Sequence, residues 1–261
     1  MRKLSMFISP CPNDTFAFDA IVNGRIPSGG LTFDVGYRDI EELNLGVLAA
    51  EGPDISKISY SVYPKIAGRY EILDSGSALG RGNGQLLVRR AGDRSPMRRI
   101  ASPGLNTTAN ALLLRYFPQT EEVVPMLFSQ IAPAVARGEV DAGVLIHEGR
   151  FVYGRHGLEL VADLGRLWEE ETSLPLPLGA IVMRRDLPQH VRRGFERLLA
   201  RSVRYALDHP TLSRPYVKEH AQELDDEVID KHISLFVNEF TISLGEEGRR
   251  AITTLCGFCG L

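Results

Sequence analysis

Short apolar runs and segments with helical spacing alternate along most of this chain. The apolar runs at residues 4–8, 31–37 and 141–146 have the length of strands, and helix-capping residues or glycines follow each of them. From residue 186 onward the pattern is mostly helical, with apolar positions such as Val191, Phe195 and Leu198 on one face. Strands that alternate with helices predict an α/β protein.

The strands fall into two groups, which predicts two lobes. Residues 1–95 together with 186–261 form the expected larger α/β lobe, completed by C-terminal helices, and residues 96–185 form the smaller one. The prolines at 175 and 177 favour an extended crossing between them. We expect a mixed sheet flanked by helices in each lobe and a ligand cleft between the lobes.

Two predicted helix starts carry polar residues. Asn13 or Asp14 is a competent N-cap for a helix over 16–22, and Asn106 or Thr107 for a helix ending at Tyr116. Free backbone N–H groups after the second cap, near Thr108 and Ala109, would attract an anion. Every helix needs a cap, however, so these residues also have a purely structural interpretation.

His147 follows the apolar run at 141–146 and should emerge at the carboxyl edge of a parallel sheet. Open α/β sheets bind ligands at that edge, and an imidazole there is a natural proton acceptor. A structural histidine bonded to a loop carbonyl fits the position equally well.

Lys57 and Ser59 share one face of a predicted strand, where they could present an ammonium and a hydroxyl group to an anion. Asn44, in a predicted helix, is either a polar ligand contact or a solvated side chain. The glycines of residues 79–84 lack the spacing of a Walker or dinucleotide loop, which favours a tight turn.

Composition narrows the function classes. The chain has 261 residues, a formal net charge of −3 and a sequence pI near 6.1, and its arginine pairs are scattered. We therefore expect no nucleic-acid partner. No secretory or membrane-spanning segment is apparent, which predicts a cytoplasmic protein without membrane insertion. Cys256 and Cys259 lack a second ligand pair, so we expect neither a metal site nor a redox role.

Six motifs, in order along nearly the whole chain, resemble the 1,4-dihydroxy-6-naphthoate synthase family. They are residues 9–16 (SPCPNDTF), 57–60 (KISY), 80–82 (GRG), 107–109 (TTA), 146–148 (IHE) with Arg150, and 174–180 (LPLPLGA). The two-lobed layout itself resembles the type II periplasmic-binding-protein fold. One departure is Asn106, where members of the family often carry histidine.

The resemblance implies a cytoplasmic carbon–carbon lyase of menaquinone biosynthesis by the futalosine pathway. It would convert cyclic dehypoxanthinylfutalosine to 1,4-dihydroxy-6-naphthoate and dihydroxyacetone, without metal or organic cofactor. His147 would be the proton acceptor, and the expected residues for the small-molecule carboxylate substrate are Lys57, Ser59, Thr107, Thr108, Ala109, Asn13, Asn44 and Arg150. The alternatives are chorismate dehydratase of the same pathway and a non-catalytic cytoplasmic carboxylate-binding protein. The sequence leaves the oligomeric state open, with a homodimer among the options.

Overall fold

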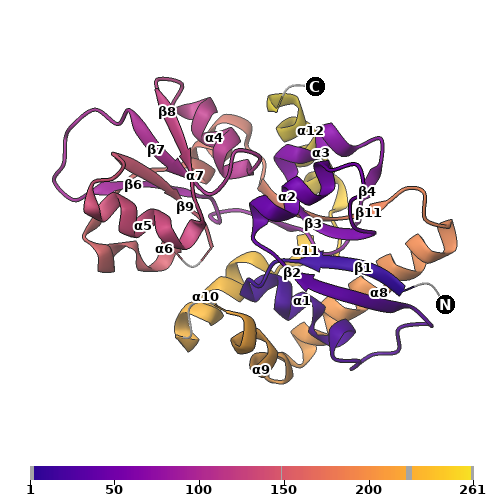
Figure 1. The fold of residues 1–261 in the computed structure, drawn as a ribbon. Helices are drawn as coiled ribbons and strands as arrows, with labels where there is room; N and C mark the ends of the chain where they lie inside the picture. Colours follow the sequence, from indigo (N-terminus) through magenta and orange to yellow (C-terminus); the bar gives the residue numbers. More distant parts are fainter. Residues whose placement is uncertain (1–2, 148, 222–224, 260–261) are drawn as a thin grey trace.

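The computed structural model describes residues 3–147, 149–221 and 225–259. It contains two lobes, each a β-sheet covered by helices, and the chain passes between them twice (Figure 1). Glu148 of the 146–148 motif lies outside the described residues. Both sheets mix parallel and antiparallel strands, as expected.

The first sheet has the strand order β2-β1-β3-β11-β4, with β5 also paired to β11. Its strands are β1 (Lys3–Ile8), β2 (Thr32–Tyr37), β3 (Ile55–Ser59), β4 (Tyr70–Ile72), β5 (Ala78–Gly80) and β11 (Leu176–Arg184). Strands β1, β2 and β3 run parallel, whereas β11 is antiparallel to its neighbours. The helices of this lobe are α1 (Pro12–Val22), α2 (Ile40–Leu48), α3 (Tyr63–Ile66), α8 (Gln189–Asp208), α9 (Pro210–His220), α10 (Asp226–Phe236), α11 (Glu239–Ile242) and α12 (Gly245–Phe258).

The second sheet has the order β10-β6-β9-β7-β8. Its strands are β6 (Leu86–Arg90), β7 (Arg99–Ser102), β8 (Glu122–Pro125), β9 (Ala142–Leu145) and β10 (Leu158–Asp163). Its helices are α4 (Thr108–Tyr116), α5 (Phe128–Arg137), α6 (Gly149–Val152) and α7 (Leu164–Thr172). Strand β9, which leads to His147, is parallel to β7 but antiparallel to β6, so the expectation of a purely parallel edge there is wrong.

The chain changes sheets earlier than the expected lobe boundaries at 95 and 186. Strand β6 pairs with β9 and β10 in the second sheet, and β11 pairs with β3 in the first. The crossings therefore lie at residues 81–85 and 173–175. Pro177 belongs to β11 rather than to a linker, because a register shift between Pro177 and Gly179 accommodates it.

The two polar helix starts behave differently. Thr107 caps α4, since its Oγ1 accepts a hydrogen bond from the backbone N–H of Asn110 at 3.2 Å. Helix α1 begins earlier than expected, at Pro12, and Cys11 is its N-cap. Asn13 and Asp14 are therefore not caps but residues of the first turn, with side chains available for tertiary contacts.

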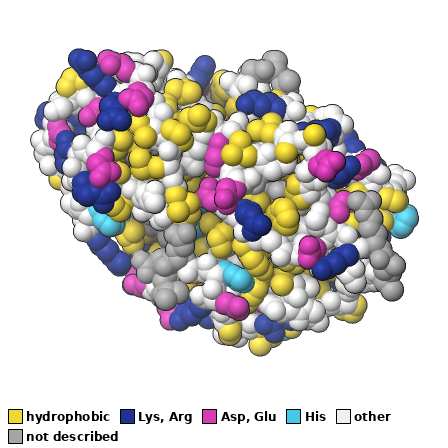
Figure 2. Space-filling view, viewed as in Figure 1, with side chains coloured by type: hydrophobic (Ala, Val, Ile, Leu, Met, Phe, Trp, Pro, Cys, Tyr) yellow, Lys and Arg dark blue, Asp and Glu magenta, His cyan; other side chains and the backbone are white. Residues whose placement is uncertain are grey.

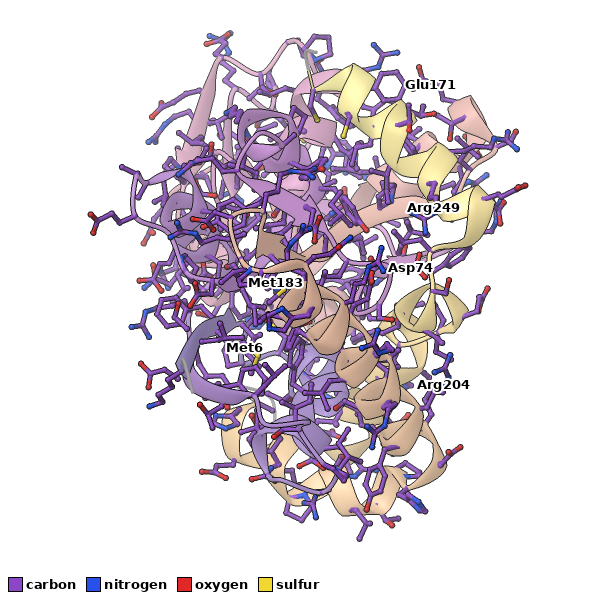
Figure 3. The ribbon with its side chains drawn as sticks, turned by 90° about the vertical axis from the view of Figure 1, so that its right-hand side faces the viewer. Met6, Asp74, Glu171, Met183, Arg204 and Arg249 are labelled. Carbon is purple, nitrogen blue, oxygen red and sulfur yellow. The ribbon has the colours of Figure 1, made fainter. Side chains whose placement is uncertain are left out.

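The C-terminal helices complete the first lobe. Phe195 and Leu199 of α8 are fully buried and belong to the same core cluster as Met6 and Met183 of the sheet. Figure 3 shows these two methionines beside the helix. Asp74 anchors the start of α12, because it accepts a hydrogen bond from Ser243 Oγ at 2.6 Å and pairs with Arg249. Among the described helices, none is both long and apolar enough to cross a membrane.

Two glycine substitutions test this packing. A Cβ atom at Gly143 in β9 would lie 2.4 Å from Cγ2 of Ile131, so Gly143→Ala should lower the free energy of unfolding by about 1–3 kcal/mol. Gly194 in α8 has no neighbour within 4 Å of such an atom, so Gly194→Ala should raise it by about 0.5–1 kcal/mol. Urea denaturation measures both, and equal effects would contradict the packing of β9 against α5.

Candidate functional site

A pocket lies between the two lobes, and both contribute to its walls. The first lobe provides residues of α1 and β3, and the second provides the start of α4 and the segment after β9. The pocket contains about 630 Å³ of non-protein space, part of it open solvent.

The structure brings together eight of the nine residues expected at the site. The residues that line the pocket are His147, Lys57, Ser59, Thr107, Thr108, Ala109, Asn13 and Arg150. Asn44 does not line it: its side chain is fully buried and accepts a hydrogen bond from the Ser59 backbone N–H at 2.8 Å. Asn44 also donates to Ser59 Oγ at 3.0 Å, so it orients the Ser59 side chain without lining the pocket itself.

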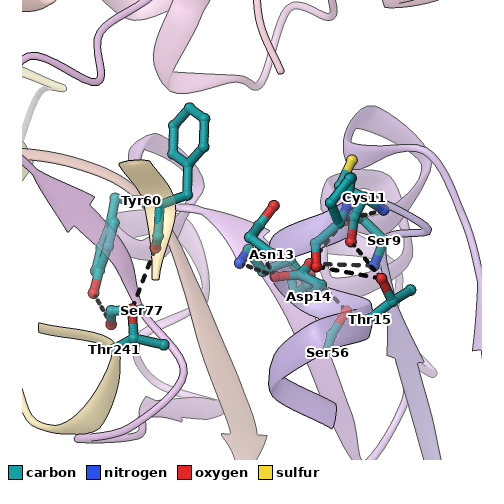
Figure 4. Close-up of polar contacts among 12 residues, drawn as sticks. Ser9, Cys11, Asn13, Asp14, Thr15, Ser56, Tyr60, Ser77 and Thr241 are labelled. Carbon is teal, nitrogen blue, oxygen red and sulfur yellow. Dashed lines mark hydrogen bonds and ion pairs between the residues drawn. The ribbon is translucent and has the colours of Figure 1, made fainter. Parts of the chain in front are cut away.

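Lys57 forms a buried ion pair with Asp14. The Nζ–Oδ1 distance is 2.6 Å, and the two side chains are only 6% and 3% exposed. Asp14 also accepts hydrogen bonds from Ser9 Oγ at 2.7 Å and from Asn13 Nδ2 at 2.8 Å (Figure 4). The carboxylate is thus surrounded by donors, which is what a buried charge requires.

The network continues through Asn13 to a second histidine. Because the amide nitrogen of Asn13 faces the Asp14 carboxylate, its Oδ1 faces His232 Nε2, at 2.9 Å. Burial lowers the pKa of His232 well below its usual value, so the ring is neutral and donates to Asn13 through Nε2–H. Its plane is stacked on the ring of His147, with centroids 6.0 Å apart and an interplanar angle of 18°.

His147 is held at the pocket by its backbone and by two rings. Its φ of 51° lies in the left-handed region, which is uncommon for a residue with a side chain. His232 lies on one side, and Phe128 makes an edge contact at 5.0 Å. Desolvation lowers the pKa of His147 to about 4; the Asp14 charge opposes this shift and the Lys57 charge adds to it. The imidazole is therefore neutral near pH 7.

The start of α4 faces the pocket with its first turn. Thr107, Thr108 and Ala109 line the wall there, and the N–H groups of a first helical turn have no partner within the helix. Thr108 Oγ1 donates to the Leu178 carbonyl of β11 at 3.0 Å, which holds this turn against the other lobe. The arrangement can hold an anion such as a carboxylate.

Asn106, the departure from the family pattern, does not line the pocket. Its Nδ2 donates to Glu41 Oε1 at 2.7 Å, and its carbonyl accepts from Ser61 Oγ at 2.8 Å. Glu41 and Ser61 belong to the first lobe. The residue therefore joins the lobes, and its side chain takes no part in the pocket wall.

Arg150 approaches the pocket from α6. Its Nη2 donates to the Gly82 carbonyl at 3.0 Å and lies 3.9 Å from Asp163 Oδ2, and its side chain is 11% exposed. Desolvation lowers the pKa of Arg150, an effect that the Asp163 charge opposes. This cation is less closely compensated than Lys57.

Several residues of the site could not be recognised from the sequence pattern. Among them are Asp14, which the pattern indicates only as a helix cap, and Gln85 and His232, which it does not indicate. The SPCPNDTF motif contains Asp14 and could have indicated it. Gln85 lies in a crossing, and His232 lies in a C-terminal helix far along the chain, so no local pattern distinguishes them.

The described residues show no group of three or more His, Cys, Asp or Glu side chains that could hold a metal ion. On the face shown in Figure 2, acidic and basic side chains are interspersed and do not form one basic patch.

Three features of the pocket can act on a ligand: the neutral imidazole of His147, the N-terminus of α4 and the partly compensated guanidinium of Arg150.

Comparison with known proteins gives the family. A sequence model described as menaquinone biosynthesis matches residues 4–260. The chain is 47% identical over 260 residues to the 1,4-dihydroxy-6-naphthoate synthase of Thermus thermophilus, which covers 98% of this chain and 93% of that protein. It is 45% identical over 258 residues to the enzyme of the same name from Streptomyces coelicolor, with 97% and 91% covered.

Solved structures confirm the fold. A crystal structure of a protein from Archaeoglobus fulgidus has a TM-score of 0.93 at 34% identity and covers 98% of this chain and 96% of that one. A Candida albicans protein described as having the generic periplasmic-binding-protein fold has a TM-score of 0.76 at 11% identity, with 100% and 90% covered. The expected two-lobed, periplasmic-binding-protein-like fold is confirmed, and the protein belongs to the menaquinone biosynthesis family of enzymes.

Proposed function

We propose that this protein is a 1,4-dihydroxy-6-naphthoate synthase, a carbon–carbon lyase that acts on cyclic dehypoxanthinylfutalosine and releases dihydroxyacetone. The observation that carries the proposal is His147, a neutral imidazole presented at a pocket between two lobes, in a chain 45–47% identical to enzymes of that name. Chorismate dehydratase and a non-catalytic binding protein are less well supported, because the two relatives carry the synthase name over nearly the full length. A cytoplasmic location, implied by the family resemblance, is part of the proposal.

His147 acts as the general base. It takes a proton from the carbocyclic substrate, and the carbon–carbon bond to the three-carbon fragment breaks. The imidazolium then returns the proton to that fragment, so that it leaves as dihydroxyacetone while the other product gains aromatic stabilisation. A positioned general base commonly accelerates a reaction by about 10²–10⁴-fold. The Asp14 carboxylate raises the pKa of His147, so it favours the imidazolium that forms when the proton is transferred.

The substrate carboxylate binds at the first turn of α4. Lys57 is less suited to this role than the sequence suggested, because its ammonium is already paired with Asp14 at 2.6 Å. The N–H groups near Thr108 and Ala109 supply partial positive charge. The Glu41 carboxylate lies just before this turn, where it accepts from the backbone N–H and the side chain of Asn106. The positive charge of Lys57 still contributes to the field of the pocket.

Contacts between the lobes keep water away from the reacting atoms. Asn106 bonds to Glu41 and Ser61, and Thr108 bonds to the Leu178 carbonyl, so the lobes meet beside the pocket. Closure of this kind strengthens electrostatic interactions inside a site.

Substitution of His147 tests its role as the general base. Replacement of His147 by alanine should lower kcat by at least about 10²-fold while substrate still binds, because His147 is the only histidine among the described residues that line the pocket. The experiment incubates purified protein with cyclic dehypoxanthinylfutalosine and follows the naphthoate product by mass spectrometry. His156→Ala is the matched control, since His156 is an exposed histidine of the same lobe.

Near-wild-type turnover by His147→Ala would remove His147 from the mechanism. Binding of the substrate by the wild type without any product would favour a binding protein, and turnover of chorismate in its place would favour the dehydratase.

The lowered pKa of His147 should also be visible in the pH dependence of activity and of stability. The pKa of His147 is lowered to about 4 in the folded state, so kcat/KM should stay level from pH 7 down to about pH 5 and fall only near pH 4. In the unfolded chain the imidazole takes up a proton near pH 6.5. The unfolded state therefore binds more protons between pH 6.5 and 4, and stability should fall as pH is lowered through that range. An acid limb of kcat/KM near 6.5 would contradict the desolvation that lowers the pKa of this ring.

A further inference from the structure

Two buried polar atoms at the pocket have no hydrogen-bond partner within the described part of the chain. They are Oε1 of Gln85 and Nη1 of Arg150. Both residues line the pocket, and Gln85 is only 6% exposed. A buried polar group without a partner costs about 1–3 kcal/mol, so a folded protein retains such groups where something else compensates them.

The two side chains belong to the same wall. Arg150 Nη2 donates to the carbonyl of Gly82, which lies in the crossing that contains Gln85. The backbone carbonyl of Gln85 accepts from Leu164 N at 2.9 Å, and the preceding residue, Asp163, lies 3.9 Å from Arg150. Gly84 makes room for this arrangement, since a Cβ there would lie 2.2 Å from Cα of Gly165.

The pairing of an unused donor with an unused acceptor defines the ligand group. Arg150 Nη1 can only donate, and Gln85 Oε1 can only accept. A carboxylate would satisfy the guanidinium but repel the amide oxygen, and an ammonium group would do the reverse. A hydroxyl group accepts from one and donates to the other, so it satisfies both.

We propose that Gln85 and Arg150 form a hydroxyl-binding subsite on the pocket wall, which holds the polyol part of the substrate. The subsite rests on the proposed function for the identity of the substrate. Gln85 is then a specificity-determining residue: its acceptor distinguishes a hydroxylated ligand from a second carboxylate.

Three variants test the subsite with cyclic dehypoxanthinylfutalosine as the probe. Gln85→Met removes the acceptor at similar size and should raise KM, and the Kd from calorimetry, about tenfold with little change in kcat. Gln85→Glu keeps an acceptor for the hydroxyl and should stay within about threefold of the wild type. Gln119→Met, the same change at an exposed loop position, is the control and should change neither value.

A stability measurement separates this role from a structural one. Because Gln85→Met removes an unpartnered buried oxygen, the Tm of the ligand-free protein should rise by about 2–4 °C even as substrate binding weakens. A structural role for Gln85 would lower the Tm. Unchanged KM and Kd in Gln85→Met would overturn the subsite. Strong loss of binding in Gln85→Glu alone would also overturn it, because that result would indicate that a carboxylate of the ligand lies at this wall.

The same measurements on the wild type and Gln85→Met distinguish failure of the lyase proposal from failure of the subsite. If the wild type binds the probe without turnover and Gln85→Met binds it about tenfold more weakly, the subsite stands and the lyase proposal falls. If the wild type turns the probe over and Gln85→Met does so with the same KM, the lyase proposal stands and the subsite falls. A wild type that neither binds nor converts the probe would overturn both.

Discussion

The buried ion pair between Lys57 and Asp14 is the constraint on which the site depends. Two charges only 6% and 3% exposed are stable only if they meet each other and satisfy their remaining hydrogen-bonding capacity. Asp14 therefore also binds Ser9 and Asn13, and this fixes which way the Asn13 amide points. Asn13 in turn sets the tautomer of His232, whose ring is stacked on His147. The electrostatic requirement of one pair thus extends to the proposed base.

The same ion pair determines which charged groups of the pocket are left to bind a ligand. Since Asp14 compensates Lys57, the lysine is not the main anchor for an anion, and the first turn of α4 is better suited to that role. Arg150 is further from its carboxylate, 3.9 Å from Asp163, and has donor capacity left for a ligand. The first turn of α4 therefore suits a carboxylate, and the wall with Arg150 and Gln85 suits a hydroxyl group; His147 lines the same pocket.

The site is complete only where the lobes meet. His147 comes from the second lobe, whereas His232, Asn13 and Asp14 come from the first. Asn106 stabilises this contact through Glu41 and Ser61. Its side chain joins the lobes and takes no part in the pocket wall.

The sequence by itself determined the features that depend on neighbouring residues. The apolar run predicted β9 to within one residue at each end and His147 directly after it. Capping chemistry limited the cap of α4 to Asn106 or Thr107, and the structure has Thr107. Only the tertiary structure decided which sheet β6 and β11 join, because strand pairing is set by partners distant in the chain. For the same reason the roles of His232 and Gln85 could not be predicted: hydrophobic periodicity shows which face of an element is buried, but not which side chain of another element it meets.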